Sequence, residues 1–116
     1  MVGKLDAEVL ERLRQDGGAT LPAALATLLA RTTPARLATI EHGVDVGDLE
    51  RVAKAAHSLR SAAANLGATD LANAAQVLEL LATMNRDCQT AALAVKACWL
   101  DIAEEVRRLS ALDPQS

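Results

Sequence analysis

A short stretch of the chain combines a nucleophilic side chain with small neighbours and positive charge. Residues 55–68 read Ala-Ala-His-Ser-Leu-Arg-Ser-Ala-Ala-Ala-Asn-Leu-Gly-Ala, and His57 supplies their one imidazole. A free imidazole is largely neutral near pH 7, so one of its nitrogens offers a lone pair for attack. Histidine is also among the side chains that form covalent intermediates. The stretch therefore indicates an accessible ring that can carry an anionic group.

The neighbours of His57 at helical spacing would leave the ring open and place cations beside it. At about 100° per residue, Ser61 and Ala64 lie on nearly the same face of a helix as His57. Arg60 and Lys54 lie to either side of that face. Small side chains leave room around the ring, and the two cations favour an anion attached to it.

A carboxylate is predicted to lie within reach of the same ring. If one imidazole nitrogen attacks, the other keeps its proton, and an acceptor would fix that tautomer. Glu79 follows His57 by 22 residues, with Gly67 and Ala68 near the midpoint. An antiparallel helical hairpin that turns there places the two side chains next to each other. The alternative is that Glu79 is only a solvated surface charge.

The composition favours helices as the elements that position these residues. The chain has 116 residues, of which 51% are hydrophobic, and Trp99 is its single aromatic residue. Much of the apolar mass is alanine, the best intrinsic helix former, and no segment alternates with a period of two. We expect an all-α fold, an antiparallel four-helix bundle with a short additional N-terminal helix. It would span residues 1–112, with residues 113–116 as a frayed tail.

Five segments carry apolar residues at helical spacing. They cover residues 5–13, 20–43, 45 or 48 to 67, 69 or 70 to about 84, and about 87 to 109. We expect Thr20 to cap the second segment, Gly43 to close it, and Pro34 to kink or break it. Thr69 or Asp70 should cap the fourth. The core-facing residues expected in the second and last segments are Leu25, Leu28, Leu29, Leu37 and Ile40, and Leu93, Ala97, Leu100, Ile102, Val106 and Leu109.

Charge and hydropathy argue against several classes of function. A net charge of −3 disfavours nucleic-acid binding, and no apolar run is long enough for a membrane span. The N-terminus does not resemble a signal peptide, so we expect a cytoplasmic protein or the cytoplasmic part of a membrane-bound sensor kinase. Cys88 and Cys98 are expected to be small buried residues of a reducing compartment. With two histidines and no Glu-x-x-His pair, a metal-binding bundle is disfavoured and no metal site is expected.

The spacing of these residues resembles the signature of histidine-containing phosphotransfer (HPt) domains. That pattern has His, then Leu two residues later, Lys at three, Gly or Ser at four, Gly at ten, and Glu or Gln at twenty-two. The matching residues are His57, Leu59, Arg60, Ser61, Gly67 and Glu79. The sequence departs from the pattern at Arg60, where a planar guanidinium replaces the point charge of lysine.

The resemblance implies a phosphorelay intermediate without kinase activity. Such domains accept a phosphoryl group from the aspartate of a receiver domain and pass it to another. The expected partners are the receiver domains of response regulators, including those of hybrid sensor histidine kinases. The chain itself would need no cofactor, because the Mg²⁺ would be held by the receiver.

The resemblance also assigns roles to individual residues. His57 would be the phosphoacceptor, Arg60, helped by Lys54, would neutralise the phosphoryl oxygens, and Glu79 would orient the ring. Ser61 and Ala64 would leave room for the group, and Gly67 would end the helix. The apolar residues expected to contact the receiver are Ala53, edges of Leu59 or Leu66, and Ala68.

A second interpretation is a helical interaction bundle without chemistry. It includes a plain scaffold and a degenerate HPt domain that binds a partner without being phosphorylated. The exposure of His57 separates these interpretations, because a bundle that only packs would bury or cover the ring.

Overall fold

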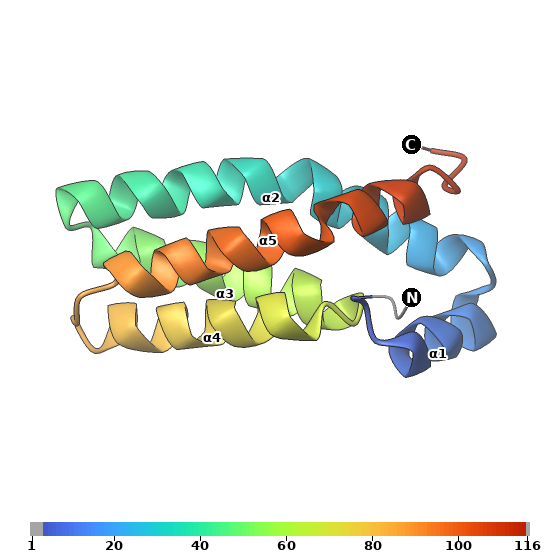
Figure 1. Cartoon of the computed structure of the whole chain (residues 1–116), viewed down its shortest axis with the longest axis horizontal. Coiled ribbons are helices and arrows are strands. Elements are labelled where there is room, and N and C mark those ends of the chain that lie inside the picture. Colours follow the sequence, from blue (N-terminus) through green and yellow to red (C-terminus); the bar gives the residue numbers. More distant parts are fainter. Residues whose placement is uncertain (1–3, 116) are drawn as a thin grey trace.

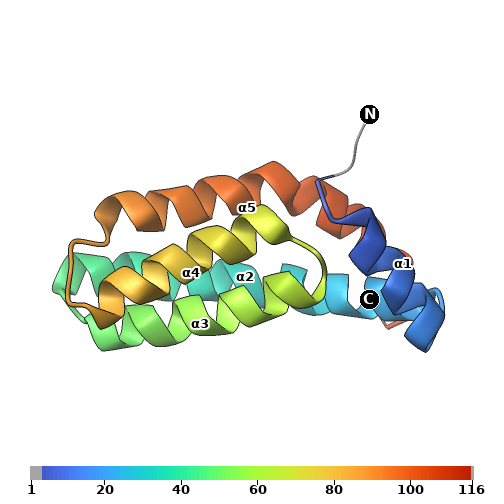
Figure 2. The same ribbon diagram turned by 90° about the horizontal axis from the view of Figure 1, so that it is seen from below.

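The computed structural model describes residues 4–115 and contains five α-helices in that range. They are α1 (Ala7–Gly17), α2 (Thr20–Val46), α3 (Leu49–Asn65), α4 (Thr69–Thr83) and α5 (Gln89–Ser110). The four long helices form an antiparallel bundle, and α1 lies at one end of it (Figures 1 and 2). Helices α3 and α4 form the most extensive pair, and α2 and α5 pack on their far side. The predicted fold class is confirmed.

Small residues allow the helices that carry the site to approach closely. Ala56 and Ala63 of α3 and Ala75 of α4 are completely buried. Little side-chain volume therefore separates the two helix axes. The larger residues that fill the rest of this core are Leu59, Leu66, Leu71, Leu78, Val95 and Trp99. Truncation of one such leucine to alanine typically costs about 2–5 kcal/mol, so this packing fixes the hairpin firmly.

The start of α3 is set by a capping contact and a tight turn. The side chain of Asp48 accepts a hydrogen bond from the backbone N–H of Arg51 at 3.2 Å. The preceding residue, Gly47, adopts the left-handed conformation with φ 76° and ends α2. Asp48, one of the two predicted starts, is thus the N-cap, and it fixes the rotational phase in which α3 presents His57.

The turn between α3 and α4 lies at Gly67, as the sequence predicts. Gly67 has φ 79°, a conformation that other residues rarely adopt. Its carbonyl accepts a hydrogen bond from the N–H of Asp6 at 2.8 Å. A Cβ atom at this position would lie 3.0 Å from the side chain of Val9. Gly67 therefore ends α3 and also holds the N-terminal segment against the bundle.

The second helix is longer than predicted. It runs unbroken through Pro34 to Val46, so the expected end at Gly43 is wrong and no break occurs. The hydroxyl of Thr33 donates to the carbonyl of Leu29 at 2.6 Å, and Pro34 lies on the exposed side. Solvent there can hydrate the carbonyl that lacks a partner because proline has no N–H.

The predicted caps of α2 and α4 are also wrong. Thr20 is the first residue of α2, and Ala19 precedes it without a side-chain cap. Thr69 and Asp70 both lie inside α4, whose N-cap is Ala68.

The inward face of α5 differs from the prediction over its first half. Leu93, Ala97 and Leu100 are exposed, as is Leu28 of α2. The buried residues of α5 are Ala91, Val95, Trp99, Ile102, Ala103 and Val106. Trp99 fills the core beside them, and the predicted core positions of Ile102 and Val106 are confirmed.

The residues after α5 fold back onto the bundle. Asp113 is buried, its N–H donates to Ser110, and its carboxylate accepts from the N–H of Gln115 at 3.0 Å. That last contact lowers the pKa of the Asp113 carboxyl. Residues 113–115 are thus held in a turn, not frayed, while Ser116 lies outside the described residues together with residues 1–3.

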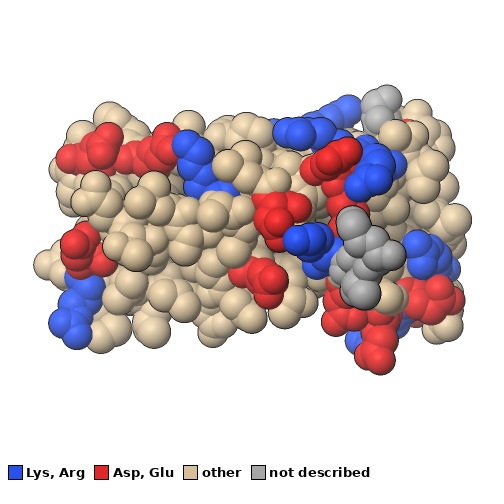
Figure 3. Space-filling model, in the orientation of Figure 1, with Lys and Arg blue, Asp and Glu red and all other residues tan. Residues whose placement is uncertain are grey.

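Charged side chains are unevenly distributed over the surface. On the face shown in Figure 3 they gather toward the end near α1 and in smaller groups at the opposite end, whereas the surface between them carries few charges. Across residues 4–115, no helix has both the length and the apolarity that a membrane crossing requires. Cys88 is buried and Cys98 is half-buried, both as free thiols. Burial raises the pKa of each thiol, and nearby carboxylates raise it further.

Candidate functional site

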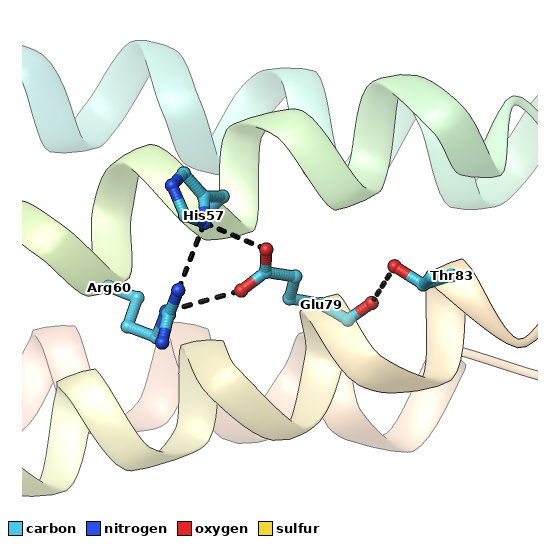
Figure 4. A network of polar contacts seen from close by, with 4 residues as sticks. All are labelled: His57, Arg60, Glu79 and Thr83. Atoms are coloured by element: carbon cyan, nitrogen blue, oxygen red, sulfur yellow. Dashed lines mark hydrogen bonds and ion pairs between the residues drawn. The ribbon is translucent and has the colours of Figure 1, made fainter.

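The α3–α4 hairpin places His57 directly beside Glu79. Nδ1 of His57 lies 2.8 Å from Oε2 of Glu79, across the 22 residues that separate them (Figure 4). The His57 side chain is 55% exposed and that of Glu79 is 25% exposed. The predicted proximity is confirmed, and the ring is open to solvent instead of packed inside the bundle.

Arg60 completes a cluster of three side chains. Its Nη2 lies 3.0 Å from Nδ1 of His57, and its Nε lies 3.2 Å from Oε1 of Glu79. The Nε–H group is buried and is not aligned for a hydrogen bond, so the contact with Glu79 is an ion pair. The cation is therefore next to the ring, as expected, but it is engaged by the carboxylate and not free in solution.

Thr83 supports the helical segment that carries Glu79. Its hydroxyl donates to the backbone carbonyl of Glu79 at 2.8 Å (Figure 4). This contact lies one turn along α4 and does not involve the carboxylate, which leaves both carboxylate oxygens to His57 and Arg60.

The remaining predicted site residues lie at different distances from the ring. Lys54 borders a hollow on the surface together with His57, but its ammonium group pairs with Glu50 at 3.4 Å in an exposed ion pair. Such pairs contribute little, so Lys54 remains available. Ser61 and Ala64 are exposed. Gly67 lies beyond the end of α3, about 15 Å from His57 along the helix axis, because each helical residue advances the chain by about 1.5 Å.

The contacts of the ring determine what it can do chemically. Glu79 is an acceptor, so its short contact calls for a proton on Nδ1 of His57. The second ring nitrogen then carries the lone pair, and it faces away from the carboxylate (Figure 4). This combination of an oriented proton on one nitrogen and an exposed lone pair on the other suits nucleophilic attack.

The apolar surface expected around the site is corrected by the structure. Leu59, Leu66 and Ala68 are buried in the core and cannot contact a partner. The large exposed apolar residues of α4 and its C-cap are Val77, Leu80 and Met84, and Leu80 borders a hollow together with Arg60 and Glu79.

Residues of α4 at the site were missed in the sequence. A second hollow is bordered by Arg60, Glu79, Gln76, Leu80 and Thr83. Gln76, Leu80 and Thr83 are three or four residues from Glu79, so helical spacing applied to Glu79 would have found them. Ser58, which borders the hollow beside His57, was also missed. In residues 4–115, no three His, Cys, Asp or Glu side chains are grouped in a way that could hold a metal ion.

Comparisons with known proteins agree with this geometry. The family model of the Hpt domain matches residues 24–112, which extend from α2 through α5. Among solved structures, the chain is similar to the crystal structure of histidine-containing phosphotransfer protein B (HptB) from Pseudomonas aeruginosa PAO1. The TM-score is 0.72 at 23% sequence identity, over 97% of this chain and 92% of that chain, which shows a shared fold. No curated protein matches the chain in sequence.

Proposed function

Because this chain belongs to the Hpt domain family, we propose that it is a phosphorelay intermediate whose phosphoacceptor is Nε2 of His57. The phosphoryl group would come from the aspartate of one receiver domain and pass to the aspartate of another. The observation that carries this proposal is the exposed ring with Nδ1 held 2.8 Å from Glu79.

The proposed transfer is a displacement at phosphorus. The Nε2 lone pair forms the N–P bond as the P–O bond to the aspartyl carboxylate breaks, and that carboxylate leaves with the electron pair. Nδ1 keeps its proton, so the ring gains positive charge during attack. The Glu79 carboxylate stabilises this charge, because it already accepts the Nδ1 proton. The reverse displacement passes the group on.

Arg60 and other residues near His57 would interact with the phosphoryl group or with the receiver. Arg60 and Lys54 would neutralise the phosphoryl oxygens, and the exposed Ser61 and Ala64 leave space for the group. The receiver would contact the face formed by α3 and α4, including the exposed stripe of Val77 and Leu80 on α4 and Met84 at its C-cap. The Mg²⁺ ion would be bound by the receiver, and this chain would supply no kinase activity. The proposal includes the cytoplasmic location expected from the sequence.

The exposure of His57 supports this proposal over a bundle that only packs. A degenerate domain would bind receivers without accepting phosphate. Two donors separate these cases: phosphoramidate, which tests the chemistry of the ring alone, and a panel of receiver domains phosphorylated in the presence of Mg²⁺, which tests the partner.

We expect both donors to label the protein and His57→Gln to abolish the label. The label should be lost in acid and retained in base, as is typical of a phosphoramidate bond. His42→Gln is the matched control, because His42 is exposed on α2 and should leave labelling unchanged. Labelling that persists in His57→Gln would overturn the assignment, and receiver binding without any labelling would favour the degenerate domain.

A further inference from the structure

Two charged side chains reach the same nitrogen of His57. Oε2 of Glu79 lies 2.8 Å and Nη2 of Arg60 lies 3.0 Å from Nδ1. Nδ1 of a neutral imidazole carries either a proton or a lone pair in the ring plane, never both. The carboxylate requires the proton and the guanidinium requires the lone pair. Only one of these two contacts can therefore be a hydrogen bond at any moment.

The two choices correspond to two tautomers with different reactivity. With the proton on Nδ1, the ring donates to Glu79 and Nε2 presents its lone pair to solvent. With the proton on Nε2, Arg60 donates to Nδ1 and no lone pair remains at Nε2. The second tautomer cannot attack phosphorus through Nε2.

Arg60 is held in position to compete. Its Nε lies 3.2 Å from Oε1 of Glu79, so the carboxylate that opposes Arg60 also keeps it beside the ring. A guanidinium presents several N–H groups in a planar fork and can contact Glu79 and His57 through different atoms. The ammonium of a lysine is a single point of charge, so the arrangement depends on arginine at this position.

We propose that Arg60 is a positioning residue that draws His57 toward its unreactive tautomer, and that Glu79 opposes it. The inference rests on the proposed function for its significance, though not for its geometry. Glu79 prevails at rest, because its contact is shorter and a hydrogen bond to a carboxylate is stronger than one to a neutral nitrogen. When Arg60 turns to the phosphoryl oxygens, its competition ends and the reactive tautomer is fully populated.

The tautomer of His57 can be read directly by long-range ¹H–¹⁵N correlation NMR, at a pH above which the chemical shifts of the ring no longer change. Protonated and unprotonated ring nitrogens differ strongly in chemical shift. His42 serves as an internal reference, since its ring is exposed and has no hydrogen bond within the described residues.

We expect Arg60→Ala to raise the ratio of the Nδ1–H to the Nε2–H tautomer about fivefold, the effect of one net hydrogen bond. Arg60→Lys should do nearly the same while keeping the charge. Glu79→Ala removes both the acceptor for the Nδ1 proton and the ion pair that holds Arg60, so its ratio should fall toward Nε2–H, to the value of the double Ala variant and of His42. A ratio unchanged in Arg60→Ala overturns the inference.

The measurement involves no phosphoryl transfer, so its failure is distinguishable from failure of the proposed function. Normal labelling of His57 with no effect of Arg60 on the tautomer overturns this inference alone. A tautomer shift in a protein that no donor labels supports this inference and overturns the phosphoacceptor assignment.

Discussion

Replacing Glu79 separates two contributions that its carboxylate makes to His57. Glu79→Gln keeps an acceptor for the Nδ1 proton but removes the negative charge. Glu79→Ala removes both. The structure places the carboxylate 2.8 Å from the ring, in a site where both side chains are partly hydrated.

The expected magnitudes follow from that distance and exposure. Two unit charges 2.8 Å apart interact by ~1.5 kcal/mol at the dielectric constant of water and by ~6 kcal/mol at an effective value of 20. The hydration of the pair and the partial charge on the ring in the transition state favour the lower end. We expect Glu79→Gln to slow transfer about tenfold, and Glu79→Ala to slow it about fivefold more through the lost hydrogen bond.

The assay is single-turnover transfer of labelled phosphate from a phosphorylated receiver, with thermal unfolding as a check that each variant is folded. Glu41→Gln is the matched control, because it removes a carboxylate paired with Lys96 away from the site. Its rate should equal that of the unaltered protein. If both Glu79 variants also transfer at that rate, the carboxylate is a solvated charge and the reasoning fails.

Three further predictions concern the surface, the turn and a thiol. Leu80→Glu should weaken receiver binding about tenfold, whereas Leu93→Glu, at a similarly exposed position on α5, should leave binding unchanged. Equal effects of the two substitutions in a binding titration would show that α4 is not part of the interface. Gly67→Ala should lower the free energy of unfolding by about 2–3 kcal/mol, against about 1–2 kcal/mol for Gly47→Ala, since both have positive φ but only Gly67 contacts the N-terminal segment. Equal losses in urea unfolding would refute the difference. The rate at which Cys98 reacts with iodoacetamide should rise with pH, and the midpoint of that rise should lie above the midpoint for free cysteine. The reason is that burial, then Asp70 and Asp101, raise the pKa of the thiol. A midpoint at or below that of free cysteine, measured by peptide mass spectrometry, would contradict this.

Sequence reasoning succeeded where a single signal decides the structure. The phase of α3 follows from one capping residue, Asp48, and one terminating glycine, Gly67. The apolar residues between Asp48 and Gly67 form a single face of α3, and that face packs against the core. The positions of His57 and Glu79 then follow from counting residues to the turn, which is why their proximity was predictable.

Sequence reasoning failed where two apolar faces of one helix fitted the helical spacing equally well. Helix α5 has two apolar faces at helical spacing, one through Leu93 and Leu100 and one through Val95 and Trp99. Periodicity alone cannot choose between them, and a preference for leucine chose the wrong one. The buried face is the one through Val95 and Trp99, and this choice depends on the surfaces of the helices that pack against α5 and not on the periodicity of α5 itself.

The partner of Arg60 was beyond sequence reasoning for a similar reason. Spacing along α3 places the guanidinium beside His57, but its ion pair is with Glu79 of the next helix. That contact depends on the distance between the axes of α3 and α4, which is set by buried alanines.

The hairpin therefore couples the packing of the bundle to the chemistry of the ring. One residue added before the turn would rotate α4 by about 100° relative to its contact with α3 and carry the Glu79 carboxylate away from Nδ1. Because Ala75 and Leu78 of α4 are completely buried, the same rotation would also expose the core. The apolar face of α4 thus fixes the register that orients the imidazole, and the exposed side of α3 stays free for a partner.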